Sequence, residues 1–108
     1  MGAKATPLMR GLQRFRRRIS ARYEIDRMIL FGSHARGEAH RHSDVDLIIV
    51  SRSFGRRNAV DRAYPLRLTW DMNYPVDLLC YTPEEFRALS RRGGLVREAL
   101  KEGVEVPE

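Results

Sequence analysis

The residues of this chain best suited to chemistry are two aspartates, Asp44 and Asp46, at the start of an apolar run. In a strand, successive side chains alternate between the two faces, so both carboxylates point the same way while Val45 points into the core. Two carboxylates held this close repel each other unless a cation lies between them. Mg²⁺ accepts paired carboxylates and keeps its other positions for water and substrate phosphates. The pair therefore predicts a metal site for phosphate chemistry.

A glycine–serine pair, Gly32 and Ser33, precedes the aspartates along the chain. Glycine lets the backbone turn and approach a ligand closely, and the start of a following helix offers N–H groups to anionic oxygens. Ser33 can donate its hydroxyl, and Arg36, one turn later, can hold phosphate with its planar guanidinium. The pair alone is also typical of an ordinary strand-to-helix turn with a serine cap. Its spacing to the aspartates favours the phosphate-binding interpretation.

A third aspartate, Asp77, interrupts an apolar stretch that otherwise predicts a strand. A lone carboxylate there is unfavourable for strand formation and for burial, so we expect something to compensate its charge. The simplest compensation is the cation predicted at Asp44 and Asp46. The alternative is a solvated position at the end of the strand.

The elements that must position these residues alternate between helix and strand. Apolar residues at alternating four- and three-residue spacing predict an amphipathic first helix, with Thr6 as its cap and Pro7 at its first position. Four consecutive apolar residues at the end of the second strand indicate cover on both of its faces and a central place in the sheet. In chain order we predict a helix over 6–23, strand 28–31, short helix 34–39, strand 44–50, helix 56–70, strand 75–81, and helices 82–90 and 95–101.

Two local signals refine this pattern. Pro65 lies inside the helix predicted over 56–70 and is expected to kink or interrupt it. Thr82 to Glu85 has the layout of a capping box and opens the next helix. The order of elements predicts an α/β (α+β) fold, a small mixed β-sheet with flanking helices.

Composition limits the class of protein. The chain has 108 residues, 43% hydrophobic and 31% charged, as expected for one globular domain. No apolar run is long enough to cross a membrane, arginines interrupt any signal-peptide core, and the single Cys80 fits a reducing cytoplasm. Met1 to Thr6 fits the loose N-myristoylation pattern, although a helix cap at Thr6 is the simpler interpretation.

The net charge is +6, from 20 basic and 14 acidic residues. This excess favours polyanions, although an arginine-rich solvated surface would produce it too. Arg14 to Arg18 are equally consistent with RNA, an acidic partner or solvent. Trp70, Tyr64 and Tyr74 are expected to pack in the core rather than to stack on a base.

Taken together, Gly32–Ala39 and Ser43–Leu47 resemble the motif of the minimal nucleotidyltransferases, part of the DNA polymerase β-like superfamily. The resemblance covers about Met28 to Phe86 and implies a nucleotidyltransferase fold like the polymerase β palm, here as one domain over residues 1–108. It assigns triphosphate binding to Gly32 and Ser33. It implies that Asp44, Asp46 and Asp77 are catalytic and hold two Mg²⁺ ions, with Asp77 helping to activate the acceptor hydroxyl. Arg36 and Ser43 would make supporting contacts to the nucleotide.

The same resemblance implies a reaction and a partner. The reaction is Mg²⁺-dependent transfer of a nucleoside monophosphate, AMP from ATP, to a hydroxyl acceptor, with release of pyrophosphate. The brevity of the chain implies that part of the acceptor site comes from elsewhere, and minimal nucleotidyltransferases are typically paired with a HEPN-family toxin whose tyrosine they modify. Two alternatives stay open, a steric antitoxin with little catalysis and transfer to a small molecule or RNA. Self-association and nucleic-acid binding stay open as well.

Overall fold

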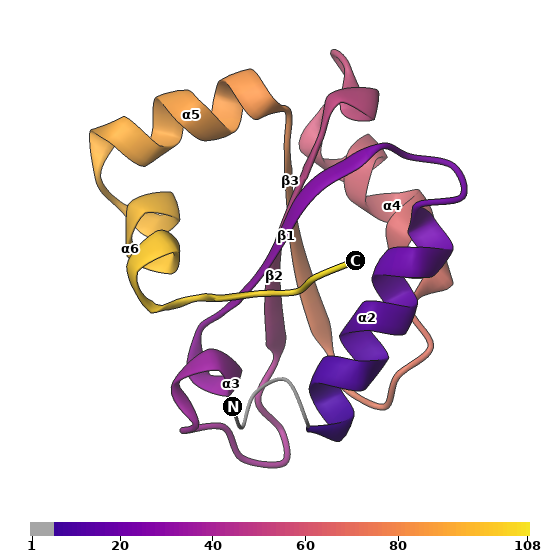
Figure 1. Cartoon of the computed structure of the whole chain (residues 1–108), viewed down its shortest axis with the longest axis vertical. Coiled ribbons are helices and arrows are strands. Elements are labelled where there is room, and N and C mark those ends of the chain that lie inside the picture. The colour runs from indigo at the N-terminus through magenta and orange to yellow at the C-terminus, as the bar shows by residue number, and fades with distance from the viewer. Residues whose placement is uncertain (1–5) are drawn as a thin grey trace.

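Four strands form one mixed sheet in the computed structural model, which describes residues 6–108 (Figure 1). They are β1 (Ile25–Phe31), β2 (Val45–Ser51), β3 (Val76–Tyr81) and β4 (Val104–Glu105), in the spatial order β3-β2-β1-β4. β1 pairs antiparallel with β2 and β4, whereas β2 and β3 are parallel. The predicted mixed sheet and the central place of the second strand are confirmed.

Helices cover both faces of this sheet, as Figure 1 shows. They are α2 (Pro7–Ile19), α3 (Ser33–Arg36), α4 (Ala59–Thr69), α5 (Pro83–Arg92) and α6 (Leu95–Glu102), with a 3₁₀ turn η1 (Arg52–Phe54). Two predicted caps are confirmed. The Met9 N–H donates to the Thr6 hydroxyl oxygen at 3.0 Å, and Thr82 and Glu85 form the reciprocal capping box.

The apolar core is divided into two layers by the sheet. α2 and α4 pack on one face, where Leu47 and Ile49 of β2 point. α5 and α6 pack on the other face, where Ile48 and Val50 point. Covering both faces explains why β2 is apolar at successive positions rather than alternating, and it fixes which face each aspartate must occupy.

The structure differs from the sequence prediction at several elements. Pro65 does not interrupt α4. It removes only one helical hydrogen bond, the one to the carbonyl of Asp61, and because Asp61 is exposed, water can donate to that carbonyl instead. The first strand begins earlier, at Ile25, and the last, β4, was not predicted. β4 has only two residues, which are too few to show the alternation of apolar and polar side chains that predicts a strand.

The N-myristoylation pattern begins at residues that lie outside the described part of the chain. Within residues 6–108, the helices are too short or too polar to cross a membrane.

A buried arginine connects α4 to its neighbours. Arg62 is only 7% exposed and donates to the carboxylate of Glu85, at 2.6 Å from Nη1 to Oε1, and to the carbonyls of Gly55 and Cys80. The Arg62 guanidinium lowers the pKa of Glu85. The side chain therefore joins α4 to β3, to α5 and to the loop at Gly55.

Replacing Arg62 by methionine should lower the free energy of unfolding by about 1–3 kcal/mol, because the carbonyl of the buried Cys80 loses its donor. Glu85 and Gly55 are exposed and can bind water instead. Urea unfolding measures this, with the exposed Arg56→Met as the matched control, expected within about 0.5 kcal/mol of wild type. Because the pKa of Glu85 is depressed in the folded state, its share of the loss should disappear as pH falls through that pKa. A wild-type unfolding curve for Arg62→Met would contradict this account.

Candidate active site

The sheet places two of the predicted aspartates side by side. In the strand register, Asp46 of β2 lies opposite Asp77 of β3 and, on its other side, opposite Phe31 of β1. Side chains two residues apart on a strand lie on the same face of the sheet. Asp46 therefore shares a face with Ile48, and Asp77 with Leu79, so both carboxylates face the α5 and α6 side. The site therefore lies where β1 ends and where β2 and β3 begin, at the edge of the sheet near α3 in Figure 1.

Asp44 completes the set from the position just before β2, where it is exposed. The pKa of Asp46 is raised, first by its partial burial and then by the negative charges of Asp77 and Asp44. His34 and Arg36 oppose this shift with positive charge. Asp77 and Asp44 thus both repel the charge of Asp46, and a bound cation would relieve the repulsion.

The geometry of the carboxylates is open. Within residues 6–108, no three His, Cys, Asp or Glu side chains come together as a ready-made metal cage. Mg²⁺ does not require such a cage, because it commonly takes one or two carboxylates and completes its shell with water and substrate phosphates. The register-paired carboxylates of Asp46 and Asp77 fit that mode of binding better than a closed metal centre.

Gly32 forms the wall beside Asp46. Its φ is +78°, a region that favours glycine, and a Cβ there would lie 2.3 Å from Oδ2 of Asp46. Gly32 is also the N-cap of α3, so Ser33 is the first helical residue rather than the cap that the sequence pattern predicted. The glycine is thus required twice, by the turn and by the close approach of the carboxylate.

The loop before Asp44 is held by contacts that sequence reasoning did not find. The imidazole N–H of His34 donates to the Ser43 carbonyl, with 3.2 Å from Nε2 to O, and the His34 ring packs edge-on against Tyr74. The Ser43 hydroxyl oxygen accepts the His40 N–H at 3.0 Å. Ser43 therefore serves the loop that presents Asp44, and no spacing in the sequence could have paired His34 with it.

Arg36 is near the carboxylates but already engaged. Its guanidinium contacts Glu38, 2.9 Å from Nε to Oε1, and Glu102 of α6, 3.3 Å from Nη1 to Oε1. The side chain is exposed, so these ion pairs are weak. A phosphate would have to replace them in order to bind Arg36.

The aromatic residues divide into two groups. Trp70 packs edge-on against Phe15, with ring centroids 5.0 Å apart, and Tyr74 packs against the same core, as predicted. Tyr64 is 61% exposed, so its predicted place in the core is wrong. Cys80 is buried in β3, and that burial raises the pKa of its thiol to about 12. It is a packing residue.

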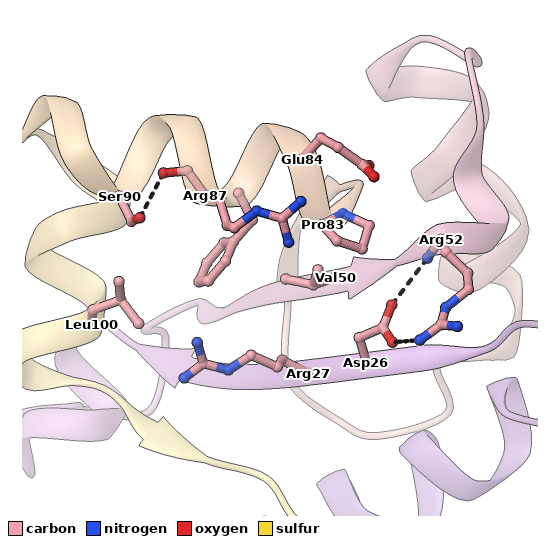
Figure 2. A pocket seen from close by; sticks show the side chains of 10 residues that line it. Asp26, Arg27, Val50, Arg52, Pro83, Glu84, Arg87, Ser90 and Leu100 are labelled. Carbon is pink, nitrogen blue, oxygen red and sulfur yellow. Dashed lines mark hydrogen bonds and ion pairs between the residues drawn. The ribbon is translucent and has the colours of Figure 1, made fainter.

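A cavity of about 630 Å³ lies at the opposite end of the same face, between α5, α6 and the start of β1 (Figure 2). Val50 lies in its floor, and Arg52, Arg27 and Arg87 line it. Figure 2 shows the Arg52 guanidinium turned to Asp26, with which it is paired at 2.7 Å. The apolar cluster around Phe86 lies between this cavity and the aspartates, so the cavity is not part of the carboxylate site.

The fold and the site combine in one arrangement. A strand, a glycine turn and a short helix are followed by paired aspartates on the next strand of a mixed sheet, and this arrangement defines a class of enzyme. The chain matches the nucleotidyltransferase domain family over residues 12–106 and belongs to that family. It is a nucleotidyltransferase of the minimal type.

Individual relatives agree with this assignment. The chain is 35% identical over 79 residues to the "Probable protein adenylyltransferase MntA" of Haemophilus influenzae, covering 71% of this chain and 69% of that protein. A structure described as a nucleotidyltransferase from Sulfolobus solfataricus has a TM-score of 0.64 at 20% identity, covering 90% of this chain and 77% of the other. A toxin-antitoxin structure with AMP-PNP has a TM-score of 0.61 at 18% identity, covering 92% and 72%. At these identities the two structures show the shared fold.

Proposed function

We propose that this nucleotidyltransferase moves AMP from ATP to a tyrosine hydroxyl of a HEPN-family toxin and so acts as an antitoxin in the cytoplasm. The observation that carries the proposal is the pairing of Asp46 with Asp77 in register beside Gly32. A relative named as a protein adenylyltransferase and a similar fold solved in a toxin-antitoxin complex with AMP-PNP support the substrate and the partner. The family match over residues 12–106 supports one catalytic domain.

The proposed reaction is an in-line displacement. The acceptor hydroxyl oxygen forms a bond to the α-phosphorus, the bond to the bridging oxygen breaks, and pyrophosphate leaves with that electron pair. Asp77, on the edge strand β3, is exposed to an incoming acceptor and takes the hydroxyl proton. Catalysis then consists mainly of positioning and charge neutralisation.

Different residues of the site would bind the metal ions and the triphosphate. Two Mg²⁺ ions held by Asp44, Asp46 and Asp77 would neutralise the phosphate charge and polarise the acceptor oxygen. The Gly32 turn and the Ser33 hydroxyl hold the triphosphate, with Arg36 and Ser43 as supporting contacts. The partner supplies the rest of the acceptor site, because the carboxylates lie at an open edge of the sheet.

The test is the mass of the product of the neighbouring gene, as the proposed toxin, after incubation with this protein, ATP and Mg²⁺. We expect an added AMP on a tyrosine, absent with Asp44→Asn, absent with chelator, and absent when that tyrosine is phenylalanine. Asp71→Asn, an aspartate outside the site, should leave the addition unchanged.

Two outcomes would contradict the proposal. Neutralisation of the toxin by Asp44→Asn, with the complex intact and no AMP added, would establish the steric antitoxin. AMP added to a small molecule or to RNA, but not to the toxin, would establish the other acceptor class.

A further inference from the structure

α4 carries an apolar stripe that faces solvent. Val60, Tyr64 and Leu68 are 74%, 61% and 70% exposed. Residues four apart lie on the same face of a helix, so the three side chains form one continuous row, the α4 stripe. Contiguous exposed apolar surface of this kind marks an interaction site.

The other side of α4 is apolar as well. Ala63 and Leu66 are buried against the sheet, where they join the core with α2. A helix with one apolar face packs that face against the core of the protein. A helix that is apolar on two opposite faces is typically buried on both. In the described chain, α4 is covered on one side only.

A cavity of about 260 Å³ lies beside the stripe, between α4 and the edge strand β3. Its walls include Val60 and Tyr64 of the stripe, Ala63, the stem of Arg67, and Leu78. The cavity is large enough for an apolar side chain from another molecule. The stripe and this cavity form one recessed apolar surface.

The charges along α4 indicate what covers this surface. Asp61 precedes Tyr64 by three residues and Arg67 follows it by three, and both lie within α4. If a second copy of α4 lies antiparallel across Tyr64, Asp61 comes level with Arg67 of the other copy. Val60 likewise comes level with Leu68. The sequence is therefore complementary to itself in charge and in apolar character.

We propose that the α4 stripe docks on the same stripe of a second copy of this chain, giving a two-fold symmetric dimer with antiparallel α4 helices. A two-fold interface must be complementary to itself, as this pattern is. Arg67 already donates from Nη1 to the Val76 carbonyl at 2.9 Å, and its other N–H groups can pair with Asp61 of the second copy, which supplies the charge complementarity. The inference rests on α4 alone and is independent of the proposed function.

The dimer leaves the carboxylate site open. α4 packs on one face of the sheet, whereas Asp46 and Asp77 point to the α5 and α6 face. Both copies of the site therefore stay accessible to nucleotide and acceptor. Transfer activity per chain should be the same in the dimer and in a monomeric variant.

Sedimentation equilibrium of the full chain over a concentration series tests the dimer. We expect reversible dimerisation with a dissociation constant in the micromolar range, because the stripe is smaller than the ~800 Å² per partner of a standard interface. Tyr64→Asp should raise that constant at least tenfold. Leu95→Asp on α6, where the side chain is 54% exposed, is the matched control and should leave it unchanged. Circular dichroism checks that each variant is folded.

A charge exchange tests the antiparallel arrangement. Asp61→Arg alone should weaken the dimer several-fold, and Asp61→Arg combined with Arg67→Asp should restore it. A monomer at every concentration up to several hundred micromolar would overturn the proposal, as would a dimer that Tyr64→Asp does not affect. If the chain stays monomeric and Tyr64→Asp instead abolishes binding to the toxin, the stripe belongs to that partner and the proposal is wrong.

Discussion

Asp46→Asn is expected to reduce nucleotidyl transfer by about a thousandfold while the protein stays folded. Asp46 is the central carboxylate of the site, in register with Asp77 and against the Gly32 turn. The amide keeps the shape of the side chain but removes the negative charge that a cation needs. Steady-state transfer measured on purified, folded protein checks this, with Asp71→Asn as the control expected to retain wild-type turnover. Full turnover of Asp46→Asn would exclude the carboxylate site as the catalytic centre.

The same substitution should stabilise the metal-free protein at neutral pH. Burial and two neighbouring carboxylates raise the pKa of Asp46, so its ionised form is destabilising in the folded state. For a raised pKa the linked stability is present at low pH and is lost as pH rises through the folded-state pKa. The Asp46→Asn protein does not lose stability in this way. Its free energy of unfolding should therefore exceed that of wild type increasingly as the pH rises from acid to neutral. Added Mg²⁺ should raise the melting temperature of wild type more than that of the variant.

Gly32→Ala is expected to lower transfer by about a hundredfold, since a displacement of about 1 Å at a reacting group has an effect of that size. The added Cβ would lie 2.3 Å from Oδ2 of Asp46, so the carboxylate must move. The φ of +78° also strains any residue with a side chain and lowers stability by about 1 kcal/mol. Transfer rates together with urea unfolding measure both effects.

Gly94→Ala separates the two causes. Gly94 is the N-cap of α6, with φ +95° and ψ −155°, close to the φ of +78° and ψ of −157° at Gly32, but a Cβ there has no neighbour within 4 Å. This variant should therefore lose similar stability and keep its transfer activity. Equal losses of activity in both variants would mean that backbone strain alone is responsible, and the wall that Gly32 forms beside Asp46 would have no special role.

Much of the fold was predictable because its signals are local. Thr6 and Thr82 have the side chains that cap helices, and the apolar end of β2 indicated a strand covered on both faces. β4 was missed because Val104 and Glu105 are held by pairing with β1 rather than by any pattern of their own. The continuity of α4 through Pro65 was missed because the rule for proline in helices takes no account of a solvent-exposed partner carbonyl.

The candidate site was predictable in its residue types but not in its geometry. Alternation along the strand predicted over 44–50 placed Asp44 and Asp46 on one face, whereas in the structure β2 begins at Val45 and Asp44 lies just before it. The neighbour relation of Asp46 and Asp77 depends on the parallel register of β2 and β3, which is set by tertiary packing. The ion pairs of Arg36 and the contact of His34 with Ser43 depend on side-chain positions that no spacing encodes. Tyr64 was placed in the core because aromatic residues are usually buried, a tendency that does not hold on the α4 stripe.

The most direct test of the central claim compares ATP labelled at the α-phosphate with ATP labelled at the γ-phosphate, in reactions of this chain with the proposed toxin partner and Mg²⁺. If the carboxylate site transfers nucleotide, the partner acquires the α-label but not the γ-label, and Asp46→Asn abolishes the labelling. Transfer of the γ-label, or α-labelling that survives in Asp46→Asn, would contradict the assignment of nucleotidyl transfer to this site.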